Sequence, residues 1–327
     1  VPADFQNLAG VVSAISEIEN RPASMDIIIT DHHAVSNVLP AAYAIINPHR
    51  SDCLYPFKDL SGVGVAFKLC QALEKRQGRD WCKYTELVTL GTVADVVPLL
   101  DENREIVRRG LAAMENTSLI GLKTLIKQSL GDNKKVTAES ISFGLAPRLN
   151  AVGRLEHAKS AVELLTTTDS NLAEEISNKL EEQNRERQKI SQEILNEAEV
   201  MLAQEEHLDT AIILANNWHP GVVGVVASRL VEKHFLPTLL FSVKDGMAKG
   251  SCRSIPALNI HDAIACEKDI LEQFGGHHQA AGLTLKTENF EKFKERFTDY
   301  VRNVVPKEGF YPHLKIDFVL DDFQTIN

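Results

Sequence analysis

The chain has 327 residues, of which 44% are hydrophobic and 24% are charged, and its formal net charge is −10. This composition is typical of a globular protein of about two domains, and it excludes a broad polycationic coat while leaving room for one basic groove. The sequence has neither a bilayer-spanning apolar stretch nor a visible signal peptide, so we expect a cytoplasmic location.

The first predicted elements are a helix over 7–20 and a strand over 25–30. The strand is apolar and β-branched, which is typical of a buried strand in a parallel sheet. Asp31, His32 and His33 follow its carboxyl end, the edge where open α/β sheets bind ligands. Carboxylate and imidazole groups are common ligands of divalent transition metals. The alternative is a polar turn that happens to be rich in histidine.

A second strand is predicted over 43–48, and Ser61 is placed to cap a helix over 62–75. This order of elements indicates a doubly wound sheet. From Trp81 to about Gln128 the pattern is helical throughout.

Asp95 is the only charge in the apolar stretch 87–100. A carboxylate in such surroundings must be paired, hydrogen-bonded or bound to metal, because an isolated buried charge is costly. The alternative is a capping Asp near Pro98.

The stretch 142–158 contains Arg148, Asn150, Gly153 and Arg154. Guanidinium groups match phosphate oxygens in a bidentate way, so this stretch could hold a phosphate. A surface loop with incidental ion pairs is the alternative. Residues 172–203 are then predicted to form one long, solvated helix that connects two domains.

A second α/β unit is predicted from about residue 209. A strand leads through the turn at His219 into a helix that carries Gly224, Ser228 and Arg229, and glycines at such a turn suit an anion at the helix N-terminus. Further strands are expected over 236–242 and over the segment that carries Ser251, Arg253 and Ser254. A helix is expected over 259–274.

Residues 274–285 have the sequence FGGHHQAAGLTL. Gly275 and Gly276 predict a tight turn beside His277 and His278, and the small residues that follow allow a ligand to lie against the backbone. We favour hydrogen-bond donation to a phosphate or a base. A second metal site and a glycine-rich helix C-cap are the alternatives. The last residues, HLKIDFVLDDFQTIN, predict one more strand.

The five cysteines are scattered and form no Cys-x-x-Cys pair, so buried, reduced thiols are predicted rather than disulfides or a zinc site. Two classes of function then fit the residues. The first is a metal-dependent phosphoesterase, because paired divalent ions activate water and neutralise phosphate. The second is a non-catalytic nucleic-acid-binding or scaffold protein of two lobes. The carboxylates at residues 31 and 95 alone are too few for a two-metal site.

The order of motifs resembles the RecJ family, single-strand-specific 5′-to-3′ DNA exonucleases of the DHH phosphoesterase superfamily. The matching motifs cover nearly the whole chain: ITDHH, LPAAYAIINP, DLSGVGVAFKL, GTVADVVPL, RLNAVGR, WHPGVVGVVASRL, KGSCRS and FGGHHQAAG. DHH oligoribonucleases and inorganic pyrophosphatases are the nearest alternatives. The resemblance implies an α/β fold of two domains, a DHH domain with a mostly parallel sheet and a smaller DHHA1 domain with a mixed sheet, joined by the long helix. We place the DHH domain at 1–165, the long helix at 166–207 and the DHHA1 domain at 208–306.

The resemblance also implies Mn²⁺ or Mg²⁺ as cofactor and roles for individual residues. Asp31, His32, His33 and Asp95 would form the catalytic metal site. The residues implied to hold the DNA strand are Arg148, Asn150, Arg154, His219, Ser228, Arg229, Ser251, Arg253, Ser254, Gly276, His277 and His278. Single-stranded DNA is the implied substrate, in recombination and repair. Single-strand-binding protein and a helicase are the implied partners of a monomeric enzyme.

The sequence departs from the family pattern at both ends. The Asp-rich motifs that precede DHH in the family are missing before Val1, and 307–327 resembles only the start of an OB-like region. We therefore expect these 327 residues alone to have little nuclease activity, because metal affinity depends on the number of ligands. Robust Mn²⁺-dependent digestion of single-stranded DNA by this chain would contradict that expectation.

Overall fold

The computed structural model describes residues 26–35, 39–132, 135–155, 159–204, 209–314 and 316. Its helices and strands divide between two compact units that meet in sequence near residue 188. The helix expected over 7–20 and nearly all of the expected last strand lie outside the described residues. Among the residues that are described, no helix is long and apolar enough to cross a membrane.

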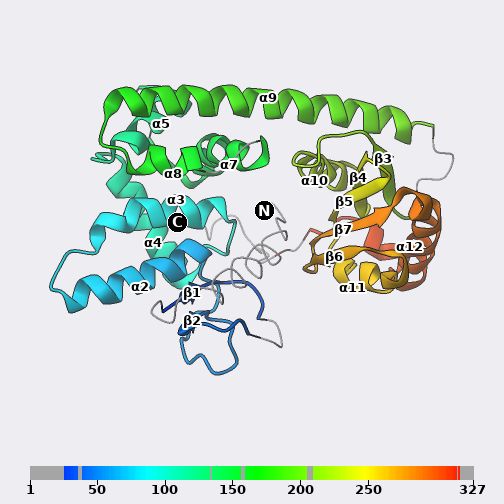
Figure 1. Cartoon of the computed structure of the whole chain (residues 1–327), viewed down its shortest axis with the longest axis horizontal. Coiled ribbons are helices and arrows are strands. Elements are labelled where there is room, and N and C mark those ends of the chain that lie inside the picture. Colours follow the sequence, from blue (N-terminus) through cyan, green and yellow to red (C-terminus); the bar gives the residue numbers. More distant parts are fainter. Residues whose placement is uncertain are drawn as a thin grey trace, which may run out of the picture. The chain divides into compact units, whose positions relative to one another are not determined.

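The first unit begins with the two predicted strands, β1 (Ile28–Thr30) and β2 (Ala44–Ile46) (Figure 1). They pair in parallel, with Ile29 opposite Ile45. The parallel pairing is as predicted, but β1 is not a buried strand, because Ile28 is 50% exposed. Among the described residues β1 pairs only with β2, so no strand covers its other edge.

Helices make up most of the first unit. They are α2 (Gly62–Arg76), α3 (Thr85–Ala94), α4 (Asp101–Met114), α5 (Ile120–Leu130), the short α6 (Ala138–Ser140), α7 (Ala146–Leu155) and α8 (Lys159–Thr166). Ser61 caps α2 as predicted, since its hydroxyl accepts the Gly64 N–H at 3.1 Å. The helical pattern over 81–128 is confirmed, although three helices share it. One buried cluster gathers side chains of α3, α4, α5, α8, α9 and the turn before α7, and a second one gathers side chains of α2, α3 and α4.

The long connecting helix is confirmed as α9 (Ser170–Leu202), the green helix that runs along the top of Figure 1. Its first half packs in the first unit, where Leu180 is fully buried. Its second half belongs to the second unit, where Glu197 accepts the Trp218 indole N–H at 2.7 Å. One continuous helix therefore contributes residues to both units.

The second unit is a five-stranded mixed sheet with three main helices. Its elements are β3 (Ile212–Asn216), α10 (Val223–His234), β4 (Thr238–Lys244), β5 (Met247–Arg253), α11 (Ile260–Ala265), β6 (Gln273–Gly276), β7 (Ala280–Lys286) and α12 (Phe290–Val304). The strand order is β3-β4-β5-β7-β6, and only β3 and β4 are parallel. Phe241 on one sheet face packs against Phe293 of α12, with ring centroids 5.9 Å apart.

The prediction of one helix over 259–274 was wrong in its second half. Helix α11 ends at Ala265, and Gln273–Gly276 form the edge strand β6. The strand pairs with β7, with Gly275 opposite Gly282, so tertiary pairing overrides the apolar spacing that suggested a helix. Helix α12 was not predicted, although its fully buried residues Phe293, Phe297 and Val301 are spaced four apart, as on one helix face.

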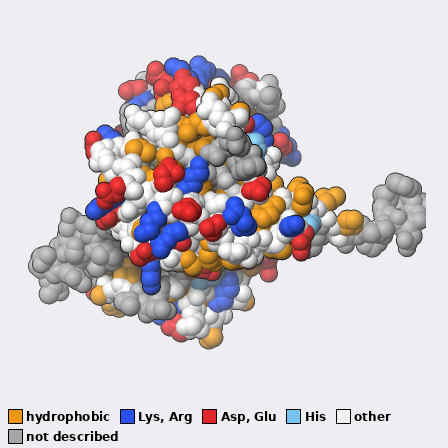
Figure 2. Space-filling model, turned by 90° about the vertical axis from the view of Figure 1, so that its right-hand side faces the viewer, with side chains coloured by type: hydrophobic (Ala, Val, Ile, Leu, Met, Phe, Trp, Pro, Cys, Tyr) orange, Lys and Arg blue, Asp and Glu red, His pale blue; other side chains and the backbone are white. Residues whose placement is uncertain are grey.

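All five cysteines are free, as expected, but only Cys252 is buried. Burial raises the pKa of the Cys252 thiol far above its ordinary value, so this thiol stays protonated and unreactive. Acidic and basic side chains are interspersed on the face of the molecule that Figure 2 presents.

Candidate metal centre and substrate-binding surface

The Asp31 carboxylate organises the turn that follows β1. Its Oδ1 accepts the backbone N–H of His32 at 2.8 Å and that of His33 at 3.2 Å, and it lies 2.7 Å from Nδ1 of the His33 ring. Burial by itself would raise the pKa of Asp31, but these hydrogen bonds outweigh it and hold the pKa below the usual value. Asp31 is therefore an ionised group that holds both histidines in place.

His32 and Asp95 face each other although they are far apart in sequence. The distance from His32 Nε2 to Asp95 Oδ2 is 3.5 Å. Burial lowers the pKa of His32, and the negative charge of Asp95 offsets this effect only in part. The His32 imidazole is thus neutral at neutral pH, which is the form that binds metal ions.

Asp95 combines a structural role with an unsatisfied atom. It is the C-cap of α3, which was one of the two interpretations open from the sequence. Its Oδ2 is buried and has no hydrogen-bond partner among the described residues. A buried carboxylate oxygen is costly to leave without a partner, so this atom is a candidate ligand for a cation.

Close packing of α2 and α3 brings His32 and Asp95 together. A Cβ at Gly62, the first residue of α2, would lie 3.3 Å from the His32 ring. Ser61 and Thr92 join the start of α2 to the last turn of α3 through a 2.9 Å hydroxyl pair. Gly91 lets the two helices approach, since a Cβ there would lie 2.6 Å from Val63.

Sequence reasoning missed Asn47, which supports the same turn. Its side-chain amide donates to the His33 carbonyl at 2.9 Å, while its oxygen accepts the His49 N–H at 2.9 Å. Asn47 is buried and directly follows β2. The carboxyl ends of parallel strands share one edge, so its position after the second strand was a usable signal.

The residues present fit a divalent cation in part. A neutral imidazole and an unsatisfied carboxylate 3.5 Å apart match two donors on one ion, since donors about 2.1 Å from an ion lie about 3–3.5 Å apart. Within the described ranges no three His, Cys, Asp or Glu side chains gather closely enough to hold a metal ion. His32 and Asp95 thus make a partial ligand set.

Arg148 is held inside the first unit by α9. Its Nε donates to Glu181 at 2.6 Å and its NH1 donates to the Gly144 carbonyl at 2.7 Å. Asn150 is exposed on α7, and Arg154 lies on the same helix with its side chain outside the described set. Residues 141–155 are helical, and they begin with a π-helical turn over Ile141–Leu145.

Because Arg148 forms this ion pair with Glu181, substitution of Arg148 should destabilise the first unit. We expect Arg148→Ala to lower the free energy of unfolding by roughly 1–3 kcal/mol, because the pair is mostly buried and its loss leaves Glu181 with a weaker partner. Arg185→Ala is the matched control, since Arg185 pairs with the same carboxylate but is 75% exposed, and it should cost about 0.5 kcal/mol or less. Equal losses in urea unfolding would contradict the prediction.

In the second unit, several of the predicted substrate-binding residues lie together on one sheet face. Arg253 Nε donates to Ser228 of α10 at 3.1 Å, and its NH1 donates to the Cys252 carbonyl at 2.8 Å. A Cβ at Gly224 would lie 2.7 Å from Ser251 Oγ, so glycine is needed where α10 crosses β5. Burial lowers the pKa of Arg253, but guanidinium remains charged at any physiological pH.

The other predicted residues of this unit are more dispersed. His219 Nδ1 accepts the Gly221 N–H at 3.2 Å in the turn before α10. Arg229 is exposed on α10. Ser254 is buried and donates to the Leu258 carbonyl at 2.8 Å, a bond within its own turn. Register places Arg253 opposite Thr238 at the start of β4, and Ser242, further along that strand, donates its hydroxyl to the Trp218 carbonyl.

Gly276, His277 and His278 form the hairpin between β6 and β7. The His277 N–H donates to the Ala280 carbonyl at 2.8 Å, and both histidines are exposed. Register sets Arg253 beside Ala280, so this hairpin lies at the end of the sheet where the guanidinium is.

The hairpin yields a sharp prediction about stability. Gly276 has φ +152°, and a Cβ there would lie 2.4 Å from Ala281 Cα, so Gly276→Ala should destabilise the second unit by about 1–3 kcal/mol. Gly275→Ala is the matched control, because no atom lies within 4 Å of a Cβ at that position. Thermal unfolding of both variants checks this, and a control as unstable as Gly276→Ala would refute it.

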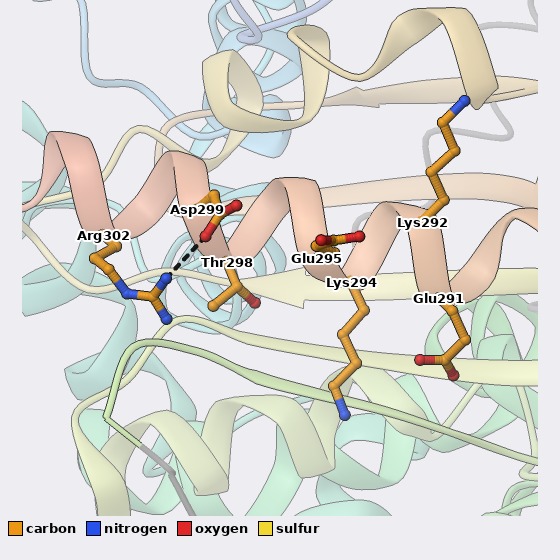
Figure 3. A pocket seen from close by; sticks show the side chains of 7 residues that line it. All are labelled: Glu291, Lys292, Lys294, Glu295, Thr298, Asp299 and Arg302. Carbon is orange, nitrogen blue, oxygen red and sulfur yellow. Dashed lines mark hydrogen bonds and ion pairs between the residues drawn. The ribbon is translucent and has the colours of Figure 1, made fainter.

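A hollow of about 560 Å³ lies on the outer face of α12, and none of the residues predicted for function lines it (Figure 3). Acidic and basic side chains alternate around it, and Arg302 pairs with Asp299 at 2.8 Å. Such a lining is typical of a solvated helix face.

Two family models match the chain: the DHH family, N-terminal domain over residues 3–92 and the DHHA1 domain over 208–303. The chain is 43% identical over 312 residues to the single-stranded-DNA-specific exonuclease RecJ of Bacillus subtilis, covering 94% of this chain and 39% of the relative. It is 36% identical to RecJ of Escherichia coli, covering 89% of this chain and 54% of the relative. The chain thus spans between two fifths and about half of these proteins.

Solved structures agree with these sequence matches. RecJ of Thermus thermophilus in complex with Mn²⁺ matches with a TM-score of 0.78 and 33% identity, over 89% of this chain and 43% of that one. Exonuclease RecJ bound to manganese matches with a TM-score of 0.72 and 33% identity, over 89% of this chain and 72% of that one.

Proposed function

The chain belongs to the RecJ family, and on that premise we propose that it acts in the metal-dependent hydrolysis of phosphodiester bonds in single-stranded DNA. The observation that carries the proposal is the buried Asp95 Oδ2, unsatisfied by any described residue and 3.5 Å from a neutral imidazole of His32. The substrate in this proposal, single-stranded DNA, is taken from the names of the relatives.

In this proposal His32 and Asp95 bind the cation. Asp31 holds His33 through its ring nitrogen and both histidines through their backbone N–H groups, so it positions ligands as well as adding negative charge. Mn²⁺ or Mg²⁺ bound there would neutralise charge on the phosphate and supply a nucleophile from water at neutral pH. RecJ structures with each of these ions support this choice of metal.

The second unit supplies the strand-binding surface. Arg253 presents a guanidinium that two serines and a backbone carbonyl orient, which suits a phosphate group of the strand. The neighbouring glycines, Gly275 and Gly282, have no side chains, so a nucleotide can approach the backbone of the sheet there. The exposed His277 and His278 are placed to donate hydrogen bonds to that nucleotide.

In the first unit we propose that Arg148, Asn150 and Arg154 contact the DNA backbone. Arg148→Ala should then weaken binding equally for all sequences and flatten its salt dependence. A loss that depends on sequence would argue for base readout instead.

Several finer features are inferred from membership of the family, and we include them in the proposal. They are 5′-to-3′ polarity, two-metal catalysis, a role in recombination and repair, a cytoplasmic location, a monomeric state, and single-strand-binding protein and a helicase as partners. The domain boundaries proposed are 1–165, 166–207, 208–306 and 307–327.

The test separates metal binding from hydrolysis. Mn²⁺ is titrated into the chain and free Mn²⁺ is followed by electron paramagnetic resonance, while degradation of a labelled oligonucleotide is followed with and without EDTA. We expect Mn²⁺ binding, slow hydrolysis of the single strand, and no hydrolysis of a duplex or in EDTA. Binding of single-stranded DNA without Mn²⁺ binding or hydrolysis would overturn the proposal in favour of the non-catalytic alternative.

A further inference from the structure

The segment 95–101, which connects α3 to α4 and includes the first residue of α4, has an unusual backbone. Val96 has φ +60° and Asp101 has φ +42°, and they are two of the four non-glycine residues with positive φ among the described residues. A β-branched residue is rarely found in this region, since its side chain clashes with the backbone. The Val96 side chain is 74% exposed, so burial of its own side chain does not compensate for the strain. Such strain persists only where surrounding structure dictates the conformation.

Asn103 supplies that surrounding structure. It is fully buried in α4, and its side-chain amide donates to two backbone carbonyls, that of Pro98 at 3.0 Å and that of Asp59 at 2.6 Å. The first carbonyl belongs to the strained connection. The second belongs to the loop just before Ser61 and Gly62, the start of α2 that contacts the His32 ring. One side chain therefore ties together the two backbone segments beside the proposed metal ligands.

The short path from Pro98 back to Asp95 is stiff. Proline fixes its own φ, and it restricts Val97 before it to extended conformations. Val96 is held on its other side by its N–H, which donates to the Val93 carbonyl at 3.2 Å. A stiff segment transmits the position of the Pro98 carbonyl to Asp95, whereas a flexible one would let the carboxylate turn away.

We propose that Asn103 is a positioning residue for the metal site: by holding the Pro98 carbonyl, it keeps the stiff segment Val96–Pro98, and with it the Asp95 carboxylate, directed at His32. The inference rests on the proposed function, because it assigns this device to the binding of a divalent cation. Asn103 and Val96 act through Asp95 and do not themselves touch the cation.

The test compares Mn²⁺ affinity with thermal stability in variants of the full chain. Asn103→Ala should lower the affinity for Mn²⁺ at least about tenfold, as expected when a group that orients a metal ligand is lost. Val96→Gly should lower it roughly three- to tenfold, because a flexible connection populates the competent conformation less often. The same Val96→Gly change removes strain, so its melting temperature should equal or exceed that of the wild type. Thr89→Val is the matched control. Its hydroxyl, fully buried between the same two helices, donates to the Ile106 carbonyl at 3.0 Å, and neither residue belongs to the 95–101 segment.

A purely structural role would not produce this pattern. Thr89→Val should melt earlier and still bind Mn²⁺ like the wild type. Val96→Asn, which tolerates positive φ better than valine, should retain wild-type affinity. If Asn103→Ala does not fold, Val96→Gly alone decides the outcome. Wild-type affinity in Val96→Gly overturns the inference and leaves the proposed function intact. Absence of Mn²⁺ binding in the wild type overturns both.

Discussion

Replacement of His32 by alanine is expected to remove Mn²⁺-dependent hydrolysis of single-stranded DNA and to weaken Mn²⁺ binding at least about tenfold. The proposed site has two donors that face each other, His32 Nε2 and Asp95 Oδ2, so loss of the imidazole removes one of the two. Burial keeps the imidazole neutral, so protons compete little with the metal near pH 7. Binding of single-stranded DNA should change less than about threefold, because a surface with several phosphate contacts does not depend on one imidazole.

Two controls make the result specific. His261→Ala removes an exposed imidazole on α11 in the second unit, and it should leave both Mn²⁺ binding and hydrolysis unchanged. Asp95→Asn keeps the shape of the side chain and removes its charge, and it should match the loss seen in His32→Ala. Wild-type hydrolysis in either His32→Ala or Asp95→Asn would exclude that residue from the metal site.

Arg253→Ala should cause the second large effect, a roughly 10- to 100-fold weaker binding of single-stranded DNA. The guanidinium is held by Ser228, Ser251 and the Cys252 carbonyl, so it is oriented before any phosphate arrives. Loss of one phosphate contact should also lower the slope of log affinity against log salt by about 0.7 for a single strand. Fluorescence anisotropy with a labelled oligonucleotide at several salt concentrations measures both quantities.

Arg302→Ala is the matched control for charge. Arg302 is exposed on the outer face of α12 and pairs with Asp299 (Figure 3), so its loss should leave affinity and salt slope unchanged. Arg253→Lys keeps the charge without the planar fork, and it should recover only part of the affinity. Equal binding by Arg253→Ala and the wild type would remove this arginine from the strand-binding surface. Circular dichroism checks that each variant is folded.

Local patterns in the sequence determined which elements form in most of the chain. The apolar runs before Asp31 and after residue 209 specified strands, and the 3.6-residue spacing between 172 and 203 specified one long helix, because these signals need no distant partner. The sequence also pointed to His32 and Asp95 as unusual, one for its place after a strand and the other as a lone charge in an apolar run. Both signals are local in the sequence, so they can be recognised without knowledge of the fold.

Only the tertiary structure decided which of these residues meet. Contact between His32 and Asp95 depends on how closely α2 and α3 pack at Gly91, which no local pattern encodes. Whether Gln273–Gly276 is helix or strand depended on an edge of β7 being available for pairing. The roles of Asn47 and Asn103 likewise come from backbone groups distant in sequence that they bridge. Local propensities set the elements, and packing between distant segments set the site, because side-chain contacts depend on distances in space rather than along the chain.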